Sequence, residues 1–151
     1  MYVPPDAMGP GGGPPEWPQR PDDPAGLSGA QRDLLWSLRR LAMVRPLGSA
    51  RDAHRDPYVH ALLQRRFGDQ GLGLEHHLRC LIVGLARRAI RPIQLHRPCH
   101  AQLSADERRL LMALDDVARP ARGAALLAPL AGTRGAELLP LLAGIAALLP
   151  R

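Results

Sequence analysis

The sequence predicts an all-α protein, a compact bundle of five or six short helices behind a Pro/Gly-rich N-terminal tail. Leucines recur with the helical period of 3.6 residues in several segments of the chain. Serine, aspartate or proline precedes most of these segments, and glycine or proline follows them, which is typical of helix ends. One stretch, residues 90–103, departs from the helical pattern. The elements expected from these signals are described below in chain order.

Residues 1–27 differ in composition from the rest of the chain. They hold eight of the sixteen prolines and a run of three glycines from Gly11 to Gly13. Such a segment has few side chains to bury and cannot offset the entropy lost on ordering. We therefore expect a disordered tail at 1–27 and a single helical domain at 28–151, with a core region at 28–119 and apolar Ala/Leu helices at 120–151.

The first helix is expected to follow Ser28, a favourable N-cap residue. Its apolar positions repeat at helical spacing and are Leu34, Leu35, Leu38, Leu41 and Ala42. Arg32, Arg39 and Arg40 fall mostly off this face. Pro46 is expected to end the helix.

The second helix is expected to begin near Ser49 or at Asp56, since Pro57 suits a first turn. Its apolar side consists of Val59, Leu62, Leu63 and Phe67, and Gly68 should stop it. The third helix has the clearest apolar stripe, made of Leu74, Leu78, Leu81, Ile82, Leu85 and Ala89.

Residues 90–103 interrupt the helical pattern. Ile93 and Leu95 alternate around Gln94, which indicates an extended connector or one short strand without an obvious partner. Ser104 and Glu107 then form the capping-box pattern of a helix start. The helix behind them is expected to bury Leu110, Leu111, Leu114 and Val117.

Residues 120–151 are rich in alanine and leucine. Thr133 is a candidate cap for the last helix, and Pro140 either interrupts that helix or marks its first turn. A helix that is apolar nearly all round is buried centrally or shared with a partner. We therefore expect an interaction surface, for another protein or a second copy, on one face of this helix. That face consists of Leu138, Leu142, Ile145 and Leu149.

Four segments resemble a known family. They are LRRLA at 38–42, ALLQRRFG at 61–68, LRCLI at 78–82 and PCHAQLSADERRLL at 98–111. The layout from 34 to 117 is similar to small, mainly alphaproteobacterial proteins of unknown function. The resemblance implies an all-helical fold and a cytoplasmic bacterial protein, and it implies no activity. The family's turn is richer in cysteine, whereas only Cys99 matches here.

Charge and cysteine usage narrow the classes of function. All twenty basic residues are arginine and the formal net charge is +6, although the tail 1–27 holds one arginine against four acidic residues. A basic body weakly favours acidic partners. Two cysteines do not make a disulfide scaffold, and neither a secretory signal nor a stretch long enough to span a membrane is apparent. We therefore expect a cytoplasmic protein without a membrane span.

The pattern His96-x-x-Cys99-His100 is either a metal site or a buried joint between helices. All three side chains can bind zinc, and a structural site would need a fourth ligand, for which Cys80 is the natural candidate. The alternative is that Cys99 is a small buried apolar residue near a helix cap, with both histidines bonded to the backbone of the turn. Because paired cysteines are absent, the alternative is favoured. We expect no cofactor, with zinc at these four residues as the competing hypothesis.

Catalysis and nucleic-acid binding are both disfavoured by the sequence. Cysteine catalysis needs a lowered thiol pKa and an oriented base, and no such set or phosphate-binding loop is recognisable. Paired arginines could contact phosphates, but arginine is ordinary at helix ends and stacking aromatics are scarce. These pairs are Arg65-Arg66, Arg87-Arg88 and Arg108-Arg109. We expect a non-catalytic accessory or protein-interaction protein, with a zinc module and an arginine-rich nucleic-acid binder as alternatives.

Overall fold

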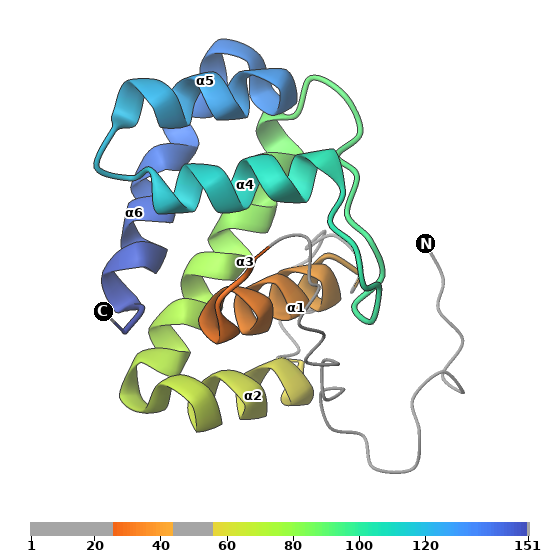
Figure 1. The fold of residues 1–151 in the computed structure, drawn as a ribbon, viewed down its shortest axis with the longest axis vertical. Helices are drawn as coiled ribbons and strands as arrows, with labels where there is room; N and C mark the ends of the chain where they lie inside the picture. The colour runs from red at the N-terminus through yellow and green to blue at the C-terminus, as the bar shows by residue number, and fades with distance from the viewer. Residues whose placement is uncertain (1–25, 44–55, 151) are drawn as a thin grey trace.

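The structure, a computed structural model, describes residues 26–43 and 56–150 (Figure 1). Within these ranges the chain forms six α-helices, two 3-10 helices and no strand, so the predicted all-α class is confirmed for them. The α-helices are α1 (Gly29–Met43), α2 (Pro57–Phe67), α3 (Gly71–Arg88), α4 (Ala105–Asp115), α5 (Pro120–Ala131) and α6 (Leu139–Leu148). The 3-10 helices η2 (Gly68–Gln70) and η3 (Gly132–Leu138) precede α3 and α6.

Some expectations concern residues outside these ranges. The predicted tail 1–27 lies outside them except for its last two residues, and so do the predicted helix end at Pro46 and the alternative helix start at Ser49. The division into a tail and one helical domain stays a prediction. None of the described helices combines the length and the apolar character needed to cross a membrane.

The ends of α2 follow from short-range chemistry. The carboxylate of Asp56 accepts hydrogen bonds from the backbone N–H groups of Tyr58 and Val59, and Pro57 occupies the first turn. These bonds satisfy N–H groups that a helix start leaves without partners. Gly68 ends the helix with φ of 55°, a left-handed conformation that glycine adopts without strain. Of the two predicted starts for this helix, Asp56 is therefore the observed one.

The start of the last helix differs from the prediction. Thr133 lies exposed within η3 and caps no α-helix. Gly132, with φ of 58°, ends α5 and is the first residue of η3, and η3 continues into α6 through the helical residue Leu138. Pro140 therefore stands in the first turn of α6, where its missing N–H costs no hydrogen bond.

Helix α3 runs through the middle of the described molecule, with α6 beside it (Figure 1). The two helices are antiparallel: a Cβ atom at Gly73 would meet Leu148, whereas one at Gly84 would meet Leu138. They approach closely because glycine faces the partner helix. A Cβ atom at Gly144 of α6 would lie 2.4 Å from His77 Nε2 of α3.

One apolar core joins all six helices. The predicted stripes of α2 and α3 are buried at Val59, Leu62, Leu63, Leu74, Leu78, Leu81 and Leu85. Phe67, Ile82 and Val117 pack against the core but stay half-buried, and Ala89 lies past the end of α3. The helical period therefore identified most of the core correctly.

Candidate functional site

The distinctive polar structure of the molecule surrounds residues 89–104, which we call the connector and which join α3 to α4. At its centre lies the carboxylate of Glu107, with an exposed fraction of 0%. Glu107 Oε1 accepts from the backbone N–H of His96 at 2.8 Å and Oε2 from that of Ser104 at 2.8 Å. Ser104 in turn caps α4, so the predicted capping box is confirmed.

The charge of Glu107 is balanced by Arg39 of α1, which is 1% exposed. The guanidinium donates from Nε to Oε1 at 2.7 Å and from Nη2 to Oε2 at 2.8 Å. It also donates to the backbone carbonyls of His100 and Gln102, both at 2.8 Å. Arg39 is thus buried although it falls off the predicted apolar face of α1, because a carboxylate and two carbonyl groups replace the water that a buried cation loses.

These contacts set the ionisation of Glu107. Burial alone would raise its pKa. The hydrogen bonds from Arg39, Ser104 and His96, together with the charge of Arg39, outweigh burial and hold the pKa of Glu107 below its ordinary value. Each carboxylate oxygen already accepts two hydrogen bonds, so Glu107 is anchored as a structural anion.

A second carboxylate, Asp106, fixes the other half of the connector. It accepts two hydrogen bonds from Arg91, at 2.7 and 2.8 Å, and one from the backbone N–H of Gln94 at 2.9 Å. The hydrogen bond from Arg91 is the main reason why the pKa of Asp106 lies below its ordinary value. Of the two predicted alternatives for this segment, the structure shows a connector and no strand. Acidic side chains at the start of α4 bind its backbone groups in place of a neighbouring strand.

The structure places His96, Cys99 and His100 on the outer side of the connector. The two imidazole rings stack with centroids 3.9 Å apart and planes 18° apart. Such a stack turns the ring faces, rather than the ring nitrogens, toward each other. Cys99 is exposed, so the expectation of a buried cysteine at this joint was wrong. Pro98 is the buried residue there.

The four predicted zinc ligands do not come together. Among the described residues, no three His, Cys, Asp or Glu side chains gather into a group that could hold a metal ion. Cys80 lies instead beside His76 on its own helix, with Sγ and Nε2 3.6 Å apart. The sequence contained this signal, because His76 precedes Cys80 by four residues and the two therefore share one side of α3.

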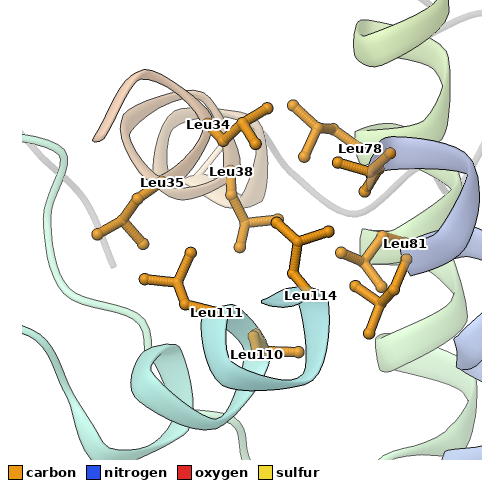
Figure 2. Close-up of a pocket in the computed structure, with 10 residues that line it drawn as sticks. Leu34, Leu35, Leu38, Leu78, Leu81, Leu110, Leu111 and Leu114 are labelled. Carbon is orange, nitrogen blue, oxygen red and sulfur yellow. The ribbon is translucent and has the colours of Figure 1, made fainter. Parts of the chain in front are cut away.

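Apolar side chains of α1 and α4 face each other across a small cavity (Figure 2). Gln31, Leu35 and Arg39 stand four residues apart on α1, and their counterparts Asp115, Leu111 and Glu107 have the same spacing on α4. The Gln31 amide donates to both oxygens of Asp115, at 2.9 and 3.1 Å. Polar pairs therefore close both ends of the α1–α4 interface, and the helices run antiparallel (Figure 1).

The cavity in the α1–α4 interface measures about 30 Å³. It is lined only by leucine and isoleucine side chains, which are Leu34, Leu35, Leu38, Leu78, Leu81, Leu110, Leu111, Leu114, Leu142 and Ile145. A void of this size has no room for a substrate and offers no polar partner to a water molecule. It is therefore a packing defect of the core.

The predicted C-terminal interaction surface lies mostly inside the molecule. Leu138, Leu142 and Ile145 are 0%, 2% and 1% exposed, and Leu149 is half-buried. These side chains face α3 and the cavity below α1 and α4. They belong to the core and cannot serve as an exposed docking stripe.

One arginine of each predicted pair forms an ion pair with an acid of another turn or helix. Arg66 binds Asp33, Arg88 binds Glu137 and Arg109 binds Asp106. The other members, Arg65, Arg87 and Arg108, are exposed. Arg66 and Arg88 thus join different elements, whereas the pair of Arg109 lies within α4. Nucleic-acid binding through the exposed arginines stays an untested alternative.

Comparisons with models of known families, with curated proteins and with solved structures find no match for the chain. The family resemblance of the four segments quoted above stays a prediction.

Proposed function

We propose that this chain is a small non-catalytic interaction protein whose partner binds the outer face of α5 and α6. One observation carries the proposal. Every exposed position of α5 and α6 except Arg122 is alanine or proline. In a chain with twenty arginines and fourteen acidic residues, this surface is unusual because it carries almost no charge. Apolar surface left exposed in this way is characteristic of protein contacts.

The physical cost of covering this face is low. Alanine and proline side chains lose almost no conformational entropy when they are immobilised. Few charged groups must lose water, since Arg122 is the one exposed charge on the two helices and the exposed Arg134 and Glu137 of η3 between them form an ion pair. The partner is another protein or a second copy of this chain. A nucleic acid is disfavoured at this face because phosphate binding requires cationic groups.

The connector supports a non-catalytic role. A general base must accept a proton through a lone pair that is free to reach it. Both oxygens of Glu107 already accept two hydrogen bonds each. The most elaborate polar cluster of the described chain is thereby committed to holding α1, the connector and α4 together.

Two arginines placed on the proposed face provide the test. Ala143→Arg with Ala147→Arg adds charge to exposed positions of α6, one turn apart. We expect sedimentation velocity and quantitative co-purification from native cells to show an association that this double variant loses, with an unchanged thermal melt. Ala86→Arg, on an exposed position of α3, is the matched control and should associate normally. Equal association by all three proteins would refute the proposal.

A further inference from the structure

A histidine and a cysteine stand one turn apart on the outer side of α3. The ring of His76 is exposed and Cys80 is half-buried, so solvent reaches the pair. Cys80 Sγ lies 3.6 Å from His76 Nε2. Thiolate and imidazole are the two protein groups that zinc binds most often in structural sites.

The separation of these two atoms fits one metal ion. Zinc binds thiolate sulfur at about 2.3 Å and imidazole nitrogen at about 2.0–2.1 Å, in tetrahedral geometry. Two such bonds at the tetrahedral angle place sulfur and nitrogen about 3.5 Å apart. The observed 3.6 Å differs from this value by roughly 0.1 Å, so the two side chains already have the separation of two ligands on one ion.

The neighbouring ligand-capable side chains are already committed elsewhere. Nδ1 of His77 bonds to the carbonyl of Gly73 at 2.8 Å, and its ring packs against Gly144 of α6. The buried carboxylate of Glu75 binds His60 at 2.8 Å and Arg79 at 3.1 Å. The site therefore offers two protein ligands, and its outer side is open to water.

We propose that His76 and Cys80 form a two-ligand site for a thiophilic metal ion of the zinc class. On binding, the Cys80 thiol releases its proton to solvent and the sulfur bonds to the metal as thiolate, while neutral His76 contributes the lone pair of Nε2. Water completes the tetrahedron. This proposal is independent of the interaction surface on α5 and α6, and it uses a different pair of residues from the zinc hypothesis at the connector.

Cobalt(II) is the probe, because cobalt bound to thiolate absorbs in the near ultraviolet. The full chain, purified without an affinity metal and kept reduced, is titrated with cobalt and then with zinc as competitor. We expect saturation at one cobalt per chain. Cys80→Ser abolishes the thiolate band, and His76→Ala weakens binding by at least about tenfold. Cys99→Ser and His100→Ala, matched controls at the connector, should bind like the original protein.

A second measurement needs no substitution. Zinc should slow alkylation of Cys80 by iodoacetamide and leave the rate at Cys99 unchanged, as read by mass spectrometry of the labelled peptides. Circular dichroism melts verify that each variant is folded. A thiolate band that survives in Cys80→Ser, a band lost equally in Cys99→Ser, or the absence of saturable cobalt binding would overturn the proposal.

Discussion

Arg39 and Glu107 illustrate how strongly the role of one residue depends on distant partners. Burying either charge alone is costly, whereas together they satisfy each other and four backbone groups of the connector. The sequence placed Arg39 off the apolar face of its helix and gave no sign that it is buried. Its burial depends on a carboxylate 68 positions later, which no local pattern reveals.

Replacing Glu107 by glutamine should therefore be severe. Glu107→Gln keeps the shape of the side chain but leaves the buried guanidinium of Arg39 without its counter-charge. We expect the free energy of unfolding to fall by about 3–5 kcal/mol in urea denaturation. Glu137→Gln breaks the half-exposed pair with Arg88 and should cost no more than about 1 kcal/mol. Similar losses in the two variants would contradict a buried ion pair.

The acidic residues at the start of α4 also predict a pH dependence. The pKa values of Asp106 and Glu107 are lower in the folded chain than their ordinary values of 3.8 and 4.5. Unfolding therefore takes up protons in acid, and stability contributed by these groups is complete above about pH 5 and lost as the pH falls through the folded-state pKa values. Denaturation midpoints measured from pH 7 to pH 2.5 should show this loss. The curve of Glu107→Gln should be flatter, and parallel curves would disprove the linkage.

At the scale of elements, the sequence correctly predicted those helix ends that depend on residues close together in the chain. Asp56 with Pro57 and Ser104 with Glu107 mark helix starts because their bonds span only two or three positions. The prediction that Thr133 caps the last helix was wrong, because η3 runs directly into α6 and α6 needs no cap there. The break in the helical pattern at 90–103 was predicted correctly, whereas the burial of Cys99 was not. The surroundings of Cys99 depend on α1 and α4, which a local sequence pattern does not place in space.

The turn between α2 and α3 gives an element-scale prediction. A Cβ atom on Gly71 would lie 2.6 Å from the carbonyl oxygen of Leu63, in the backbone of α2, which cannot step aside. We expect Gly71→Ala to lower the free energy of unfolding by about 1–3 kcal/mol. Gly73→Ala meets only a flexible methyl of Leu148 at 3.0 Å and should stay within about 1 kcal/mol of the original chain. Equal thermal shifts in the two variants would argue against this close contact.

For the whole molecule, α6 packs one side into the core and exposes the other. The apolar stripe that begins at Leu138 of η3 fills the space beside α3 and reaches the cavity between α1 and α4. A strongly apolar sequence predicted either burial or a partner, and the structure shows burial for Leu138, Leu142 and Ile145. The sequence could not decide between the two, because that choice depends on how many other helices surround α6.

This arrangement predicts opposite outcomes for two double variants of the same helix. Leu142→Arg with Ile145→Arg places two charges without partners in the core and should abolish the cooperative unfolding transition. Ala143→Arg with Ala147→Arg adds the same charge to exposed positions and should keep it. Circular dichroism during heating distinguishes these results. A folded Leu142→Arg/Ile145→Arg protein would show that α6 is not part of the core.

The polar pairs that close the α1–α4 interface join residues that the ribosome adds at very different times. Gln31 and Asp115 are 84 positions apart. A ribosome that adds roughly 5–20 residues per second needs on the order of 4–17 s to cover that interval. During this time Leu34, Leu35 and Leu38 have no α4 to cover them. Helix α1 is thus the first described helix to be synthesised, but the side of it that faces α4 is covered only after residue 115 has been added. Until then these leucines are apolar surface that the nascent chain leaves exposed.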